Sequence, residues 1–102
     1  MSFWKEIKLW DERANDAVGK LIKFAYEETK DIIYSYVDGF GIEHNPIKSV
    51  LDTYELGGNS KNSIVELKHI LRNYDICNFG DIKYSNNVKL AKKIVEFEKS
   101  LK

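Results

Sequence analysis

Hydrophobic residues recur with a period near 3.6 through most of the chain, which predicts helices separated by short polar or glycine-containing breaks. The longest such stretch runs from Ser2 to Asp38. Its apolar stripe contains Phe3, Ile7, Ala14, Val18, Leu21, Ala25, Ile32 and Tyr36. Lys5, Lys23 and Lys30 lie away from this stripe, and we expect the DGFG sequence at 38–41 to stop the helix.

A second helix is predicted to start at Asn45-Pro46, because Asn is a strong N-cap and Pro suits the first helical position. Its apolar face contains Ile47, Val50, Leu51 and Tyr54. Gly57-Gly58 should end it after about three turns. A helix this short needs tertiary packing to be stable in water.

A third helix is predicted to start near Ser63, since Ser63 and Glu66 have the spacing of a capping box, with Ser60 as a possible earlier cap. We expect it to end at Asn78–Gly80. Its apolar positions with helical spacing are Ile64, Leu67, Ile70, Leu71 and Tyr74.

A fourth helix should follow Ser85 and continue to the end of the chain. Residues 81–85 before it fit a loop better than a strand, because a lone strand would lack a pairing partner. The apolar stripe of this helix contains Val88, Ala91, Ile94, Val95 and Leu101.

These segments predict an all-α fold, a compact bundle of about four helices forming one domain over residues 1–102. The first helix would be about 54 Å long, whereas a chain of this length folds into a globule of about 30 Å. It should therefore either bend near Asn15–Gly19, where the helix formers are weakest, or project beyond the bundle. A projecting end would expose Trp4, Ile7 and Trp10.

Composition agrees with a folded domain, with 43% hydrophobic and 31% charged residues. The formal net charge is zero but is unevenly distributed. Residues 1–60 contain seven basic and eleven acidic side chains, and residues 61–102 contain nine basic and five acidic ones. This asymmetry could steer a charged partner or help two copies associate head to tail, but solvated faces of drifting composition are the favoured explanation.

Cys77 is the single cysteine, so an intrachain disulfide is impossible and nothing indicates an oxidising compartment. Charges at Lys5, Glu6 and Lys8 interrupt the N-terminal apolar residues, which argues against a signal peptide. No run approaches the roughly 20 apolar residues of a membrane-spanning helix. We therefore expect a cytoplasmic protein that does not insert into membranes.

The sequence offers no set of residues with a recognisable catalytic or metal-binding spacing. His44, His69 and Cys77 match no zinc motif. His69 and Cys77 are eight residues apart, so on one helix they share a face but are too distant to bond. The glycine pairs lack the Lys-Ser/Thr of a phosphate-binding loop. We therefore predict no enzyme activity, no metal, no cofactor and no small-molecule substrate.

The favoured function is protein binding by a small steric module of the inhibitor, immunity or adaptor type. Tryptophan and tyrosine are the usual energetic anchors of such contacts, and acidic residues crowd positions 27–55. The partner is predicted to be another protein or a second copy of the chain. The predicted binding residues are Trp4, Ile7, Trp10, Glu27, Glu28, Asp31, Tyr34 and Tyr36.

Two alternatives remain open from the sequence. Trp4 and Trp10 flank the apolar stripe, so they could belong to the core instead of a binding surface. The second alternative is a nucleic-acid-binding regulator, because the C-terminal helix is rich in lysine and starts beside Asn86-Asn87. Such binding would be weak and salt-sensitive. Its predicted contacts are Lys83, Lys89, Lys92 and Lys93.

Overall fold

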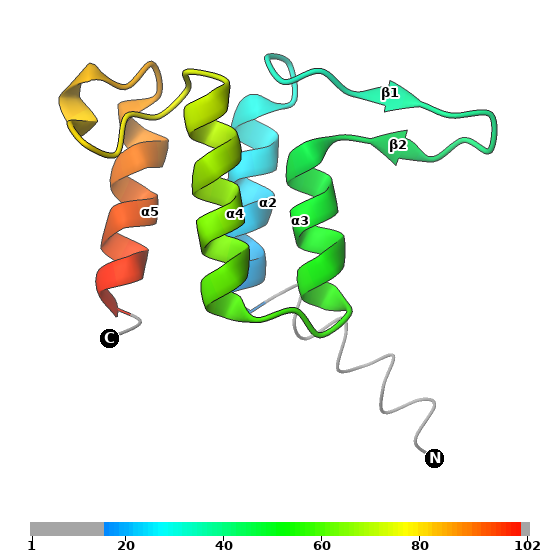
Figure 1. Cartoon of the computed structure of the whole chain (residues 1–102), viewed down its shortest axis with the longest axis horizontal. Helices are drawn as coiled ribbons and strands as arrows, with labels where there is room; N and C mark the ends of the chain where they lie inside the picture. Colours follow the sequence, from blue (N-terminus) through cyan, green and yellow to red (C-terminus); the bar gives the residue numbers. More distant parts are fainter. Residues whose placement is uncertain (1–15, 101–102) are drawn as a thin grey trace.

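The computed structural model describes residues 16–100, which form a helical bundle with one projecting hairpin (Figure 1). The predicted all-α bundle of about four helices is confirmed for this part of the chain. Its elements are α2 (Ala17–Thr29), β1 (Tyr36–Val37), β2 (Glu43–His44), α3 (Pro46–Glu55), α4 (Ser60–Asn73), the 3-10 helix η1 (Ile82–Tyr84) and α5 (Val88–Ser100).

The helix α2 begins within the segment where the sequence indicated a weak point. Asp16 is extended, with φ −76° and ψ 178°, and its carboxylate accepts a hydrogen bond of 2.9 Å from the Gly19 amide. Asp16 is therefore an N-cap and not a residue inside a continuous helix. The predictions for Trp4, Ile7 and Trp10 lie outside the described residues.

The prediction that the first helix continues to Asp38 is wrong, because α2 ends at Thr29. The buried Thr29 hydroxyl donates to the Ala25 carbonyl at 2.7 Å, and the Thr29 carbonyl accepts the amides of both Ile32 and Ile33. This turn carries Ile33 into the core with 2% of its surface exposed, whereas Ile32 and Tyr36, which the helical pattern placed beside it, are exposed. The run IIYSYV at 32–37 is β-branched or aromatic at five positions, which favours extended backbone.

The helix α3 agrees with its prediction at both ends. The buried Asn45 has extended backbone, and its side-chain oxygen accepts the amides of Ile47 at 2.8 Å and Lys48 at 3.3 Å. Pro46 occupies the first helical position, where a missing amide hydrogen costs nothing. After the helix, Gly57 adopts φ +107°, a conformation that other residues rarely adopt.

The helix α4 starts one turn earlier than the proposed capping box at Ser63. Asn59 caps it by accepting the Asn62 amide at 3.1 Å, so Ser63 lies inside the helix and is buried. The helix also ends earlier than expected, at Asn73, and Asp75 follows with φ 57°. The capping prediction failed because the extended backbone of Asn59 already provides the cap one turn before Ser63.

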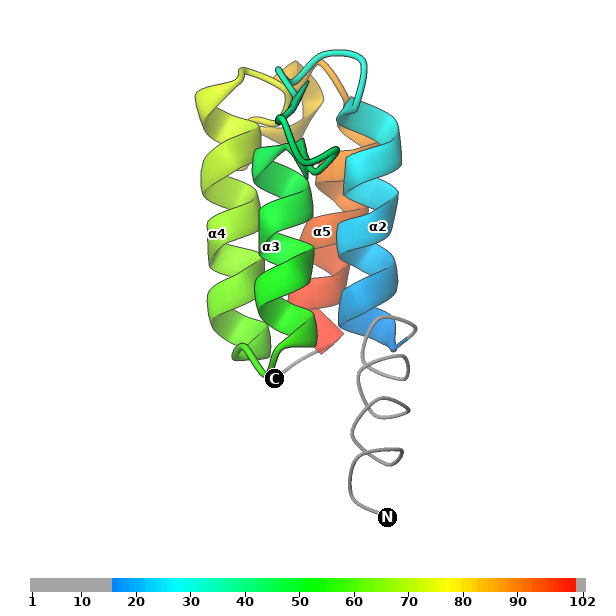
Figure 2. The ribbon, with the colours of Figure 1, turned by 90° about the vertical axis from the view of Figure 1, so that its right-hand side faces the viewer.

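Residues 82–84 form the short helix η1, and α5 starts at Val88, as expected after Ser85. Leu90, Ala91 and Ile94 of α5 are completely buried. The predicted stripe contained Ala91 and Ile94 but missed Leu90. The core brings α2, α3, α4 and α5 together, and Figure 2 shows α3 between α2 and α4 with α5 behind it. Within residues 16–100 no helix is long and apolar enough to cross a membrane.

Candidate functional site

The connection between α2 and α3 is a β-hairpin that extends away from the bundle (Figure 1). We call residues 34–44 the arm. Tyr36 pairs with His44 and Val37 pairs with Glu43 in antiparallel register. The residues between them, which the sequence suggested as a helix stop, form the hairpin turn, in which Gly41 has φ +80°.

Asp38 fixes the turn at the tip of the arm. One of its carboxylate oxygens accepts the amides of Phe40 at 2.8 Å and Ile42 at 3.1 Å, and its own amide donates to the Ile42 carbonyl at 2.9 Å. Its other oxygen lies 2.7 Å from Nε2 of His44. The contact with His44, followed by the bonds from the two amides, lowers the pKa of Asp38 below its ordinary value. The ionised carboxylate of Asp38 thus holds the turn at the tip in place.

One face of the arm presents a row of rings. The His44 ring stacks on Tyr36 with centroids 4.7 Å apart and planes 15° apart. The Tyr34 and Tyr36 rings have centroids 6.0 Å apart. These contacts restrain both tyrosine rings, and a restrained side chain loses less entropy on binding than a free one.

The base of the arm is joined to α2 through Glu43. Its carboxylate accepts the Tyr26 hydroxyl at 2.8 Å and the Ser35 hydroxyl at 2.9 Å, and it lies 3.8 Å from the Lys48 ammonium. The hydrogen bond from Tyr26, and then that from Ser35, lowers the pKa of Glu43. The same bond to Glu43 is the main cause that raises the pKa of Tyr26. Polar groups of the arm are therefore directed toward one another and toward the bundle.

Apolar side chains, by contrast, point from this region into solvent. Six of the ten large hydrophobic residues that are exposed among residues 16–100 lie between positions 32 and 42. Phe40 at the tip is 91% exposed. The six are Ile32, Tyr34, Tyr36, Val37, Phe40 and Ile42. Apolar groups gathered in this way, more densely than elsewhere among residues 16–100, are typical of a contact surface.

The structure places the predicted anchors Tyr34 and Tyr36 together on the arm but separates the predicted acidic residues. Glu27 on α2 pairs with Lys30 at 2.8 Å. Glu28 faces α5, where it accepts the Asn87 side-chain amide at 3.1 Å and lies 3.9 Å from Lys89. Asp31 is exposed near the base of the arm. Glu27 and Glu28 of the acidic band at 27–55 are thus paired locally, and they are paired with residues of different helices and connections.

The sequence analysis did not identify Phe40, Ile42, Val37 and Ile32 as exposed apolar residues of a candidate contact surface. The signal that identifies them is a β-branched and aromatic run followed by the glycine-containing turn DGFG. That signal predicts a hairpin. Ile32 and Tyr36 also have helical spacing, which concealed it.

The lysines of the alternative site are distributed over two elements. Lys89 and Lys93 of α5 lie over the ring of Phe24 on α2, with their ammonium groups 5.3 and 4.4 Å from its centroid. Lys83 belongs to η1 and contacts the Tyr84 ring at 5.2 Å, and Lys92 is exposed on α5. Lys89 and Lys93 are therefore close together, while Lys83 comes from a separate element.

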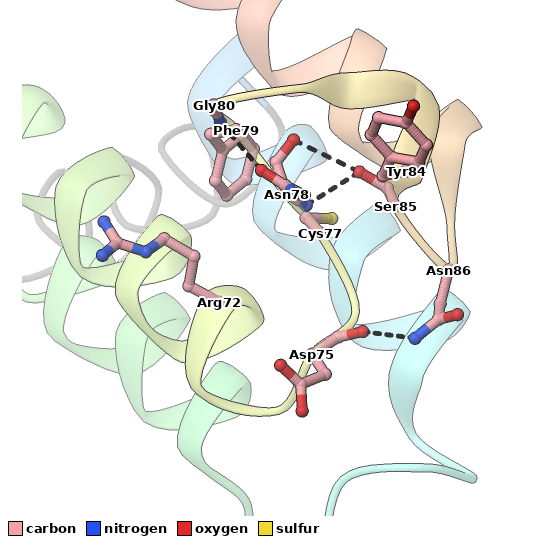
Figure 3. Close-up of a pocket in the computed structure, with 9 residues that line it drawn as sticks. All are labelled: Arg72, Asp75, Cys77, Asn78, Phe79, Gly80, Tyr84, Ser85 and Asn86. Atoms are coloured by element: carbon pink, nitrogen blue, oxygen red, sulfur yellow. Dashed lines mark hydrogen bonds between the residues drawn. The ribbon is translucent and has the colours of Figure 1, made fainter.

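A polar hollow of about 680 Å³ lies in the connection from α4 to α5 (Figure 3). Its polar groups largely bond to one another: the Ser85 hydroxyl accepts the Asn78 amide at 2.7 Å, and the Asn86 side chain donates to the Asp75 carbonyl. Burial raises the pKa of Cys77 on its wall to about 11, which keeps the thiol protonated and unreactive at neutral pH.

Cys77 and His69 line different hollows. The sulfur lies 3.9 Å from the Asn87 carbonyl, and His69 lines a different, smaller hollow with Arg72 and Phe79. Among residues 16–100, no three His, Cys, Asp or Glu side chains are grouped closely enough to hold a metal ion. Comparison with models of known protein families, with curated proteins and with solved structures finds no match.

Proposed function

We propose that this protein is a non-enzymatic protein-binding module whose contact surface is the arm. The observation that carries the proposal is the combination of a tip and base fixed by Asp38 and Glu43 with six large apolar side chains directed outward. A hairpin ordered in advance loses little entropy on binding, and exposed aromatic rings are the usual anchors of protein interfaces. Phe40, Tyr34 and Tyr36 are the proposed anchors.

The mechanism is steric and needs no chemistry at the site. The arm reaches beyond the helices, so it can enter an apolar recess or cover a surface that the bundle itself does not contact (Figure 1). An inhibitor, an immunity protein and an assembly factor would all use such a contact. Trp4, Ile7 and Trp10 remain predicted additional contacts outside the described residues.

Site-specific photocrosslinking in producing cells tests this proposal. A photoreactive amino acid at position 40 should give discrete crosslinked protein species, because the side chain at the tip would be buried by the partner. The matched control is the same amino acid at position 56, since Leu56 is also an exposed large aliphatic residue but lies at the end of α3. Equal crosslinking at both positions, or none at position 40, would contradict the proposal.

Nucleic-acid binding is retained as a second candidate because Lys89 and Lys93 lie together beside Phe24 on the surface of α5 and α2. If all four lysines contact phosphates, raising the salt concentration from 50 to 200 mM should weaken binding by about 10²-fold. Fluorescence anisotropy with a labelled single-stranded oligonucleotide measures this. Absence of binding at low salt would remove this candidate.

A further inference from the structure

The exposed apolar side chains of the arm are distributed over both faces of the hairpin. Tyr36 and Val37 are neighbours in β1, so their side chains point to opposite faces. The rings of Tyr34, Tyr36 and His44 lie on one face, which we call the ring face. Val37 shares the opposite face with Glu43, its partner in β2. Tyr36 is 49% exposed and Val37 66%, so a flat partner surface would leave one of them in water.

The backbone at the tip of the arm needs few hydrogen bonds from outside. The amides of Phe40 and Ile42 donate to the Asp38 carboxylate. The amide of Gly41 donates to the Asp38 carbonyl at 3.1 Å, and that of Asp38 donates to the Ile42 carbonyl at 2.9 Å. An amide that leaves water without a partner costs free energy, and four of the five amides in residues 38–42 are already paired. The tip can therefore leave water at a small cost in hydrogen bonds.

The arm stands clear of the bundle even on the face that is tied to it. Glu43 on this face accepts the Tyr26 hydroxyl of α2 at 2.8 Å, whereas Val37 beside it is exposed. Figure 1 shows both strands extending away from α3 to the side of the bundle. Another molecule can therefore reach both faces of the hairpin.

We propose that the partner is a different protein with an apolar recess that encloses the tip of the arm, so that Phe40 enters first and Tyr36 and Val37 contact opposite walls. This inference rests on the proposed function, since it names the kind of surface that the arm fits. Layers of protein structure pack about 10 Å from a strand pair, so each wall lies at about that distance from the hairpin. Extended backbone rises about 3.3 Å per residue, so the stretch from Tyr36 to Phe40 reaches up to about 13 Å into the recess. A shallow groove would not hold it.

The Asp38 carboxylate favours a protein recess over a lipid bilayer. Its side chain lies in the tip and remains 26% exposed, and its lowered pKa keeps it ionised at neutral pH. An ionised carboxylate is costly in hydrocarbon, whereas a protein wall can present an amide or a basic side chain to it. We therefore expect apolar walls with one such donor near the position of Asp38.

Photocrosslinking from both faces of the arm tests this enclosure in the full-length chain in producing cells. A photoreactive amino acid is placed at position 36, 37 or 40, and at position 65 as the control, since Val65 is an exposed valine on α4. Positions 36, 37 and 40 should give the same crosslinked protein species, because one recess contacts all three. Position 65 should not give that species.

A charge on the face opposite the rings provides a second test. In the chain with the photoreactive residue at position 40, Val37→Lys should abolish the crosslink, because the lysine would have to enter an apolar recess. Circular dichroism should show that the helices remain folded. Val65→Lys makes the same change on α4 and should leave the crosslink unchanged. A partner lying flat on the ring face would instead tolerate Val37→Lys.

The outcomes separate the recess from the proposed function. A crosslink from position 36 or position 37 alone, or a position-40 crosslink that survives Val37→Lys, would overturn the recess and leave the proposed function standing. A crosslinked species at twice the chain mass of 11.9 kDa would identify a second copy as the partner. Flotation with phosphatidylcholine–phosphatidylserine vesicles that is lost in Phe40→Ala would identify a bilayer, and either result would also overturn the recess. Absence of crosslinks from all three positions would overturn both proposals.

Discussion

Two connections lie at the same end of the bundle (Figure 1). Most of their apolar side chains are packed against the core in one and exposed in the other. The arm joins α2 to α3, and the α4–α5 loop, residues 74–87, joins α4 to α5. Each is fixed by one side chain that accepts two backbone amides: Asp38 accepts those of Phe40 and Ile42, and Asn78 accepts those of Gly80 and Asp81.

The difference lies in where the apolar side chains go. In the α4–α5 loop Ile76 and Cys77 are buried, and Phe79 and Ile82 pack against the core. In the arm the corresponding residues are exposed. This fold can therefore bury the apolar side chains of a connection, and the exposure of those on the arm is a property of the arm itself. This exposure does not contribute to the packing of the core, and it supports the proposed binding role of the arm.

The largest expected difference between the two connections is in unfolding free energy. Ile76→Ala should destabilise the protein by about 3 kcal/mol, because it leaves a cavity in the core. Phe40→Ala should change stability by less than about 0.5 kcal/mol, because the ring contacts little of its own chain. Urea denaturation followed by circular dichroism measures both. A large decrease in unfolding free energy from Phe40→Ala would mean that the tip stabilises the fold and would contradict this difference between the two connections.

Removing the side chains of Asn78 and Asp38 should give a smaller difference in unfolding free energy. Asn78→Ala should lower the unfolding free energy by about 1 kcal/mol, since it removes the acceptor for two amides in a loop that packs on the core. Asp38→Ala should leave the urea midpoint unchanged and affect only the arm. Amide hydrogen exchange distinguishes these cases, because Asp38→Ala should speed exchange at Phe40 and Ile42 alone. Equal loss of global stability in both variants would contradict this distinction.

Tyr26→Phe should loosen the base of the arm without unfolding the bundle. The substitution removes the hydroxyl that donates to Glu43 and keeps the ring that packs beside the core. Exchange of the β1 and β2 amides should accelerate several-fold, while amides in α4 should be unaffected. Ser35→Ala removes the second donor to the same carboxylate and should have a weaker effect in the same direction. Unchanged arm exchange in both variants would show that Glu43 does not hold the arm.

The smallest predicted effect is a pH dependence limited to the tip. The pKa of Asp38 is lowered in the folded protein, so its contribution is fully present above the unfolded value of about 3.9 and is lost as pH falls through the folded pKa. The NMR shifts of the Phe40 and Ile42 amides should therefore titrate below that value. The variant Asp38→Asn should abolish this titration. A midpoint above the ordinary value would contradict the cause given for the shift.

Local sequence signals predicted helix boundaries where the capping residue lies next to the helix in the chain. Asn45-Pro46 predicted the start of α3, because the cap and the first helical residue are neighbours in the chain. Helical spacing identified the buried residues Ile64 and Leu67 on α4. It was less complete on α5, where Leu90 is buried beside the predicted stripe, since the core covers a wider face of that helix than the spacing indicated.

The arm was not predicted, because its local hairpin signal competed with a helical stripe over the same residues, and the contacts that decide between them come from residues outside the run that forms β1. Ile32 and Tyr36 fit a helical stripe as well as a strand, and the choice between them depends on pairing with Glu43 and His44 and on the bond from Tyr26 to Glu43. Propensity within one window contains none of these contacts.

The same distinction between local signals and tertiary structure applies to the candidate contact residues. Tyr34 and Tyr36 were chosen for their residue type alone, and the structure places both rings on the arm. Their neighbours at the tip, such as Phe40, become recognisable only once the hairpin is known, because exposure depends on which backbone conformation the segment adopts. Residue type can therefore suggest anchors, whereas the extent of a surface follows from the fold.

Both ends of the arm meet the bundle at residues that are held in the core, with Ile33 buried before β1 and Asn45 buried after β2. Between these two residues the chain can change in sequence and length while the helices keep their packing. Mutations on the proposed contact surface and mutations that alter stability should therefore fall on different residues. Over evolutionary time such a hairpin can diverge, be replaced or be transferred to another scaffold faster than the bundle that carries it.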